Sequence, residues 1–428
     1  MDSQGSMQGY PHENMTSGFY GLGIAPALLQ ILGRLNFKTP TPIQKQAIPI
    51  AIQGTDIVGV AQTGTGKTLA FGVPMIQCLA QVKGQGLVVL PTRELALQVE
   101  EVLRKVGQSL GFRTAVLIGG ASLRPQVQAL ARRPHIIIAT PGRLIDHLNQ
   151  KNLHLDNVHI VVLDEADRML DMGFLPQIQK ILQVLPKDRQ TMLFSATMPQ
   201  EVMRIAAGYM KLPVRVEIAP TGTTVERVTQ ELFIVGKDQK ARLLEKLLES
   251  YHGSTLVFTR TKYGAKKVVR HIRAIGVNAA EIHSNRSLNQ RREALEGFKA
   301  GKYRVLVATD IASRGIDVVG IELVLNYDLP STSDDYVHRI GRTARAGAGG
   351  HAITFAMPDQ QREVRAIERL IRKTLPVSKL PELPPARVVE FSLPPQRSTH
   401  PQAGGPHRRS TGFQHHRRAP YRSPRNRF

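Results

Sequence analysis

Two short segments, about a hundred residues apart, carry the residue types best suited to chemistry. The first reads Ala61-Gln62-Thr63-Gly64-Thr65-Gly66-Lys67-Thr68 and follows the apolar stretch 57–60. Such a turn can wrap backbone N–H groups around phosphates, while Lys67 reaches the β and γ oxygens and Thr68 offers a hydroxyl to Mg²⁺. A glycine-rich turn without a ligand is the alternative. Ala61 also stands where the strict phosphate-loop pattern has its first glycine.

The second segment reads Asp164-Glu165-Ala166-Asp167 and follows the apolar run 160–163. At a strand end, Asp164 can hold a metal ion through water and Glu165 can orient the attacking water. Alone, a short acidic run is more often a solvated helix start. The two segments together predict a nucleotide triphosphatase that uses Mg²⁺, with Thr68 and Asp164 as the metal-binding residues.

Apolar runs alternate with helical patterns along most of the chain, and these elements must position the two segments. Continuous apolar strands between helices indicate a parallel sheet covered on both faces. The alternation pauses at the small, polar residues 219–224 and then restarts, which predicts two α/β domains in tandem. The expected strands lie at residues 86–90, 115–118, 136–139, 160–163 and 192–194, and then at 232–235, 255–258, 305–308, 323–326 and 352–355.

These patterns give the expected domain boundaries. We expect a disordered N-terminus at 1–18, a first domain at 19–218, a linker at 219–228, a second domain at 229–375 and a disordered basic tail at 376–428. The tail is rich in Pro, Arg, His, Gly and Ser, a composition that cannot bury enough apolar area to fold.

Composition narrows the class of protein. The 428 residues suit two or three domains, and 42% of them are hydrophobic. The only cysteine, Cys78, excludes an internal disulfide and favours a reducing compartment. The N-terminus lacks the features of a signal peptide, and no apolar run is long enough to span a membrane. We therefore expect a soluble, cytoplasmic protein with no membrane partner.

The net charge of +23 predicts a polyanionic partner. Eight arginines fall in residues 397–428, which contain no Asp or Glu, so +15 remains for the rest. A basic surface that only aids solubility is the alternative.

Further motifs occur along the chain in the order that is typical of one protein family. Over residues 19–375 the chain resembles the DEAD-box ATP-dependent RNA helicases. The resemblance implies two tandem RecA-like domains, each a parallel β-sheet flanked by helices. It also implies an adenine-reading motif in Phe37 and Pro40-Thr41-Pro42-Ile43-Gln44, preceded by the isolated aromatic Phe19. The amide of Gln44 offers both a donor and an acceptor to an adenine edge.

In the first domain the resemblance assigns RNA-backbone contacts to Pro91, Thr92, Arg93, Gly119, Gly120, Thr140 and Arg143. Arginines supply charge, threonines supply hydroxyls, and glycines allow close approach of the main chain to phosphates. Gly119-Gly120 alone could be a simple turn. Ser195 and Thr197, with Asp167, resemble the motif that couples the ATP state to RNA binding.

In the second domain the resemblance assigns Thr309 and Arg291 to RNA, Asp317 to the nucleotide sugar, and His338 to coupling. Arg342 and Arg345 are assigned to the γ-phosphate, where the fixed donors of Arg suit the charge of the transferring phosphoryl group. A charge-rich surface helix is the alternative for residues 338–345. Three residues depart from the family pattern: Ala344 and Ser284 replace glycines, and Leu288 replaces a glutamine that helps Arg291 hold RNA.

The resemblance implies an ATPase that is RNA-stimulated and unwinds short duplexes, or remodels RNA–protein complexes, when its domains close. The expected partners are single strands and short duplexes of RNA, contacted through the backbone by a monomeric core. Ribosomal precursors and RNA-decay proteins are expected further partners. Two alternatives stay open: an ATP-gated RNA clamp that does not unwind, and a DNA translocase of the wider superfamily.

Overall fold

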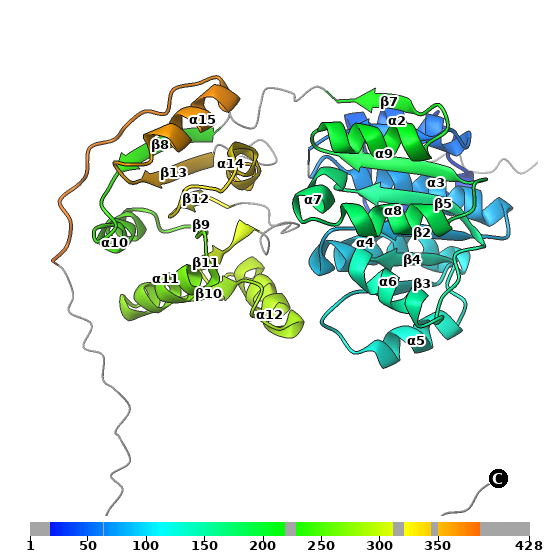
Figure 1. The fold of residues 1–428 in the computed structure, drawn as a ribbon, viewed down its shortest axis with the longest axis horizontal. Coiled ribbons are helices and arrows are strands. Elements are labelled where there is room, and N and C mark those ends of the chain that lie inside the picture. The colour runs from blue at the N-terminus through cyan, green and yellow to red at the C-terminus, as the bar shows by residue number, and fades with distance from the viewer. Residues whose placement is uncertain (1–17, 63, 219–227, 311–320, 344–349, 386–428) are drawn as a thin grey trace, which may run out of the picture. The chain divides into compact units, whose positions relative to one another are not determined.

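The computed structural model describes residues 18–62, 64–218, 228–310, 321–343 and 350–385. Their strands form two separate sheets in which every pairing is parallel (Figure 1). The expected fold class, two parallel sheets flanked by helices, is therefore confirmed. Within these ranges no helix is both long enough and apolar enough to cross a lipid bilayer.

The first sheet has the strand order β3-β4-β2-β5-β6-β1-β7 within the described residues. Its strands are β1 (Ile57–Val60), β2 (Gln85–Val89), β3 (Thr114–Leu117), β4 (Ile136–Ala139), β5 (Val158–Asp164), β6 (Gln190–Ser195) and β7 (Val214–Glu217). Side chains alternate between its two faces, as β5 illustrates. Val162 packs into one hydrophobic core and Val161 into the other.

Helices cover both faces of this sheet. One core contains residues of α1 (Pro26–Arg34), α2 (Pro42–Ile52), α3 (Lys67–Gln81) and α4 (Arg93–Gly107), which the short 3₁₀ helix η1 (Gln108–Leu110) follows. The other contains residues of α5 (Leu123–Ala131), α6 (Pro141–Asn149), α7 (Ala166–Asp171), α8 (Leu175–Val184) and α9 (Gln200–Tyr209). Burial on both faces explains why the central strands read as continuous apolar runs.

The second sheet has the strand order β10-β11-β9-β12-β13-β8 in the part of the chain that is described. Its strands are β8 (Val228–Ile234), β9 (Thr255–Phe258), β10 (Ala279–Ile282), β11 (Val305–Ala308), β12 (Leu323–Asn326) and β13 (Gly350–Ala356). Its helices are α10 (Lys240–Ser250), α11 (Lys262–Ala274), α12 (Leu288–Lys299), α14 (Ser333–Ile340) and α15 (Gln361–Ile371). We call the two sheets with their helices the first and second lobes.

Three expected boundaries need correction. Gly18, expected to be disordered, donates its N–H to the carbonyl of Lys38 at 3.0 Å. Val228, expected in the linker, is the first residue of β8. Residues 376–385, expected in the disordered tail, are described, and their first part lies along β8, where Val377 forms a parallel bridge to Leu232. Backbone hydrogen bonds, which composition does not reveal, hold this proline-rich segment.

Candidate nucleotide-binding and RNA-binding sites

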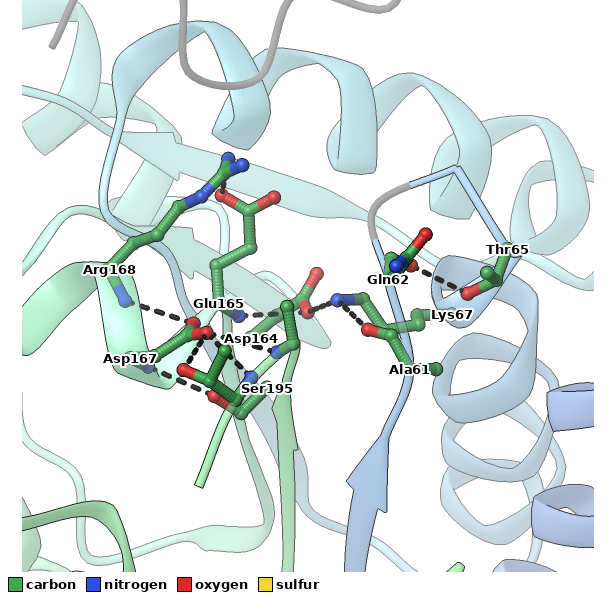
Figure 2. A network of polar contacts seen from close by, with 11 residues as sticks. Ala61, Gln62, Thr65, Lys67, Asp164, Glu165, Asp167, Arg168 and Ser195 are labelled. Atoms are coloured by element: carbon green, nitrogen blue, oxygen red, sulfur yellow. Dashed lines mark hydrogen bonds and ion pairs between the residues drawn. The ribbon is translucent and has the colours of Figure 1, made fainter. Parts of the chain in front are cut away.

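The glycine-rich loop joins β1 to α3 at the carboxyl edge of the first sheet. Gly64 and Gly66 have φ of 86° and 88°, a left-handed conformation that favours glycine. The ammonium of Lys67 donates to the carbonyl of Ala61 at 3.0 Å, which holds its charge inside the loop (Figure 2). Thr63 lies outside the described residues. Backbone N–H groups at this helix start and the buried Lys67 together make an anion site.

Gln44 is tied to this loop. Its Oε1 accepts from the Thr41 N–H at 2.9 Å, and its Nε2 donates to the Gly66 carbonyl at 2.9 Å. A Cβ on Gly66 would lie 2.4 Å from Nε2 of Gln44, so the close contact requires glycine. The amide therefore connects the segment expected to read adenine to the phosphate loop.

The two aromatic residues expected near the nucleotide pack against the first lobe. Phe37 is half-buried against the core. Phe19 is 1% exposed and packs in that core. Its expected place beside the nucleotide stays a prediction.

Asp164 ends β5 and faces the loop. Its Oδ1 lies 3.8 Å from Nζ of Lys67 and accepts the Glu165 N–H at 2.9 Å (Figure 2). Burial raises the pKa of Asp164 to about 6, although the Lys67 charge opposes the rise. Burial therefore destabilises the charged form of Asp164, and a cation beside the carboxylate would stabilise it.

Glu165 occupies a strained turn between β5 and α7. Its φ is 55°, in the left-handed region, which costs a non-glycine residue about 1 to 2 kcal/mol. Its carboxylate lies 2.8 Å from Nη1 of Arg168, and both side chains are buried. Burial alone would raise the pKa of Glu165, but Arg168 and Lys67 hold it below its usual value. Glu165 is thus charged at neutral pH.

Asp167 links the acidic segment to the end of β6. Its N–H donates to Oγ of Ser195 at 3.1 Å, and its Oδ2 accepts from the N–H of Ala196 at 3.1 Å. Thr197 adds two further donors to Oδ2, its N–H at 2.8 Å and its hydroxyl at 2.9 Å. Burial would raise the pKa of Asp167, but Lys67 and the Thr197 hydrogen bonds lower it. These contacts join Ser195, Ala196 and Thr197 to the acidic segment.

The donor set at this site fits Mg²⁺. Asp164 supplies one carboxylate beside the loop that carries Thr68, and Mg²⁺ keeps several of its waters when bound with a phosphate. No group of three or more His, Cys, Asp or Glu residues is arranged for a metal within the described ranges. The raised pKa of Asp164 is also consistent with a carboxylate that an incoming cation would stabilise.

The RNA-binding residues expected in the first lobe converge on the loop after β3. Gly120 has φ of 70°, and a Cβ there would lie 1.9 Å from Nη1 of Arg93. Arg143 donates from Nη1 to the carbonyl of Ala121 at 3.1 Å. Two guanidinium groups thus flank a loop whose glycines, Gly119 and Gly120, leave the main chain accessible. Since β3, β4 and β2 are neighbours, their carboxyl ends bring these segments together.

The remaining expected residues of that surface begin helices. Thr92 caps α4, with its Oγ1 accepting the Leu95 N–H at 3.3 Å, and Pro91 precedes it. Thr140 caps α6, and its hydroxyl is 3.5 Å from the Leu117 carbonyl. Both threonines and Pro91 are buried, so their side chains support the surface more than they form it.

In the second lobe, the residues that are described lie on adjoining elements. Thr309 follows β11 and donates its N–H to the Ile282 carbonyl of β10 at 3.3 Å, and Arg291 lies on α12, which packs on both strands. His338 is on α14 and Arg342 follows that helix, where it is buried. Burial lowers the pKa of His338 to about 4, so its ring is neutral. Asp317 and Arg345 lie outside the described residues.

Arg339 holds this part of the second lobe together, a role that the sequence did not assign to it. Its guanidinium pairs with Asp310 at 2.5 and 2.8 Å, and donates to Asn326 at 3.1 Å and to the Asp328 carbonyl at 2.6 Å. It also lies 4.9 Å from the ring centroid of Phe258. Arg339 therefore fixes α14, and so the start of the segment containing Arg342, against the ends of three strands.

Arg168 is the second residue that the sequence reasoning missed. A basic residue three positions after Glu165 was a usable signal, because residues three apart share one side of a helical turn.

Two family models match the chain. The DEAD/DEAH box helicase model matches residues 41–205, and the helicase conserved C-terminal domain model matches residues 239–347. The chain is 41% identical to the ATP-dependent rRNA helicase RRP3 of Debaryomyces hansenii over 367 residues, covering 85% of this chain and 77% of that protein. It is 42% identical to the DEAD-box ATP-dependent RNA helicase CshA of Geobacillus kaustophilus over 369 residues, covering 85% and 79%.

Solved structures show the same likeness. Dbp5 of S. cerevisiae bound to RNA and ADP BeF3 matches with a TM-score of 0.74 at 29% identity, covering 85% of this chain and 95% of that one. Mss116p bound to ssRNA and AMP-PNP matches with a TM-score of 0.76 at 29% identity, covering 85% and 78%.

Proposed function

The chain belongs to the DEAD/DEAH box helicase family, and we propose that it is an RNA-dependent ATPase that separates short RNA duplexes by closing its two lobes around ATP and RNA. The observation that carries the proposal is a buried polar network that begins with Lys67 and Asp164 and continues through the Glu165–Arg168 ion pair to Asp167 and Thr197. It joins the phosphate-binding loop to the residues that follow β6. A change at the nucleotide can therefore reach other parts of the lobe.

The residues of the first lobe divide the chemistry of hydrolysis. Lys67 and the loop N–H groups bind the phosphates, and Mg²⁺ held by Thr68 and Asp164 would neutralise charge on the β and γ oxygens. Glu165, kept charged by Arg168 and Lys67, can accept a hydrogen bond from the attacking water and orient it. This assignment explains why a strained residue occupies that turn.

The second lobe supplies the arginines that we assign to the γ-phosphate. Arg342 and Arg345 are the residues we assign to the γ-phosphate, where an arginine is typically worth about 10³ to 10⁵ in rate. RNA contacts are divided in the same way, with Arg93 and Arg143 on one lobe and Arg291 and Thr309 on the other. Because ATP and RNA would both favour the closed form, each should raise the affinity for the other.

We further propose that the natural substrates are structured ribosomal precursors. This rests on the relative from Debaryomyces hansenii, which is named an rRNA helicase. Contacts to the RNA backbone do not read the bases, so they do not restrict the substrate to one sequence. RNA recovered from messenger decay intermediates instead would redirect the proposal to RNA degradation.

Glu165→Gln tests the function. We expect the variant to bind ATP and RNA but to hydrolyse ATP at least about 100-fold more slowly, as expected for loss of a water-orienting group. Each enzyme molecule should separate the strands of at most one short RNA duplex. Glu217→Gln, an exposed residue on β7, is the matched control. Crosslinking RNA to the Glu165→Gln form would identify the substrates.

Three results separate the alternatives. Parent enzyme that hydrolyses ATP with RNA but never separates strands would be a clamp. Equal stimulation by DNA and RNA of one sequence would indicate a translocase. Unchanged hydrolysis by Glu165→Gln would refute the catalytic assignment.

A further inference from the structure

A stripe of basic side chains runs along α15, at the end of the second lobe. Arg362, Arg365 and Arg369 recur at intervals of three or four residues, so they lie on one side of the helix, and Arg372 is the C-cap residue that follows its last turn. Lys373 follows them directly. We call these five residues the α15 stripe. All five side chains are exposed, whereas Val364 and Ile367 on the other side of the helix are buried in the core.

The α15 stripe borders a groove of about 720 Å³. Among the described residues, its lining consists of these five basic residues with Glu368 and Thr374. The side-chain carboxylate of Glu368 accepts the Leu375 N–H at 2.9 Å, and the backbone carbonyl of Glu368 accepts the Lys373 N–H at 3.2 Å. Glu368, the one acidic residue in this described lining, is therefore engaged in ending the helix.

Among the described residues, no carboxylate lies within ion-pair distance of any member of the stripe. Some other exposed cations of the chain do have a carboxylate partner, such as Lys105 with Glu101 at 2.7 Å and Arg215 with Glu217 at 2.8 Å. Within the stripe, one contact is a bond from Nε of Arg369 to the Arg365 carbonyl at 3.3 Å. Five like charges on one short surface repel one another, so an external anion would relieve a cost that the folded chain bears.

The stripe is separate from the RNA-binding residues already described. Its helix packs on β13 and β8 through Val364 and Ile367, beside α14 (Figure 1). Thr309 follows β11, which lies three strands from β13 in the sheet. At about 4.8 Å per strand, this is a separation of roughly 14 Å across the sheet.

We propose that the α15 stripe is an auxiliary binding site for the phosphate backbone of RNA, outside the motif-lined site. This rests on the proposed function, which provides the RNA. Consecutive arginines are spaced by about one helical turn of 5.4 Å, which suits a repeated anion rather than a single one. Among the described residues, the groove lining includes no aromatic side chain, so contacts to the backbone phosphates should dominate and binding should depend little on sequence. The stripe would hold a substrate near the enzyme while the motif-lined site acts on another part of it.

The test compares full-length variants in their binding of a duplex RNA with a single-stranded extension, from 50 to 300 mM KCl. The triple variant Arg362→Gln, Arg365→Gln, Arg369→Gln removes three charges while keeping good helix-forming residues. We expect the slope of log affinity against log salt to fall by about 2 to 3, since each phosphate contact contributes about 0.7 to 0.9. Replacing the same three arginines by Lys should restore the parent slope, because phosphate attraction needs only the charge.

The matched control removes three exposed cations from the first lobe, Lys180, Lys187 and Arg204, by substitution with Gln. We expect its slope to stay at the parent value. Circular dichroism and melting of all variants should match the parent, because the altered side chains are exposed.

Several outcomes would overturn the proposal. It fails if the triple variant keeps the parent slope, or if the control loses as much as the triple variant. It also fails if vesicles containing phosphatidylserine bind the parent but not the triple variant while the RNA slope is unchanged, which would assign the stripe to membranes. ATP hydrolysis at saturating RNA should be equal in all four proteins: the parent, the two triple variants of the stripe and the first-lobe control. A parent without RNA-stimulated hydrolysis would instead refute the proposed function.

Discussion

Oδ2 of Asp167 accepts two hydrogen bonds from Thr197, one from its backbone N–H at 2.8 Å and one from its hydroxyl at 2.9 Å. Asp167 belongs to α7, which begins directly after Glu165, whereas Thr197 follows the end of β6. A displacement of α7 therefore changes the position of residues 195–197. Because Asp167 is almost completely buried, water cannot easily replace these bonds.

Thr197→Val should separate ATP hydrolysis from strand separation. Valine keeps the shape of threonine and removes only the hydroxyl, leaving the two N–H bonds to Oδ2. We expect the unwinding rate to fall about 10-fold, in line with loss of one hydrogen bond to a charged group, and hydrolysis to fall less than 3-fold. Rates measured on one RNA duplex decide this.

Thr191→Val is the control for this substitution. Thr191 lies on β6, the strand that precedes Thr197. Its buried hydroxyl has no hydrogen-bond partner among the described residues. Its replacement should leave both rates unchanged. Equal loss of hydrolysis and unwinding in Thr197→Val would contradict the coupling role.

Asp164→Asn should stabilise the nucleotide-free protein, and more so at high pH. The folded pKa of about 6 exceeds the ordinary value of 3.8, so the charged carboxylate destabilises the folded state. This cost is absent well below pH 4 and grows until pH passes 6. Asparagine removes it, at about 1.4 kcal/mol per pKa unit.

Melting curves without Mg²⁺ or nucleotide test this prediction. The variant should melt above the parent at pH 7.5, with a smaller difference at pH 4, and should not hydrolyse ATP. An equal difference in melting temperature at pH 7.5 and pH 4 would mean that the charged form of Asp164 does not destabilise the folded protein.

Arg339→Gln should destabilise the second lobe by about 3 to 5 kcal/mol, since it leaves the partly buried Asp310 without its ion-pair partner. Urea unfolding, monitored on the full chain, measures the loss. Lys302→Gln, which breaks an exposed pair with Glu293 at 3.9 Å, should cost less than about 1 kcal/mol. Similar stability of both variants would show that Arg339 is not a structural centre of the lobe.

Local patterns were sufficient to predict the central strands and the phosphate loop. Strands buried on both faces must be apolar, and a loop that wraps phosphates needs glycines, so both produce a recognisable pattern in the sequence. Three strands were not in the expected set: β1, which is the apolar stretch before the glycine-rich loop, and β7 and β10, which lack this pattern. β7 lies at a sheet edge with three of its four residues exposed, and β10 contains Glu281.

The role of Arg339 could not be read from local patterns, whereas the position of Arg168 three residues after Glu165 was a usable local signal. Arg339 depends on the partly buried carboxylate of Asp310, which only the folded chain brings close. The proline-rich start of the tail was assigned to disorder by composition. Its contacts are with backbone groups of β8 and with Arg242, whose guanidinium donates to the Pro384 carbonyl, and composition does not encode these.

The most direct measurement concerns the division of the catalytic residues between the two lobes. It is the rate of RNA-stimulated ATP hydrolysis by full-length Arg345→Ala at saturating ATP, with Arg204→Ala as the control for loss of one exposed arginine. We expect a decrease of about 10³-fold or more, as for other arginines that contact a transferring phosphoryl group, with ATP affinity within a few-fold of the parent. Hydrolysis at the parent rate would contradict a pocket completed by the second lobe.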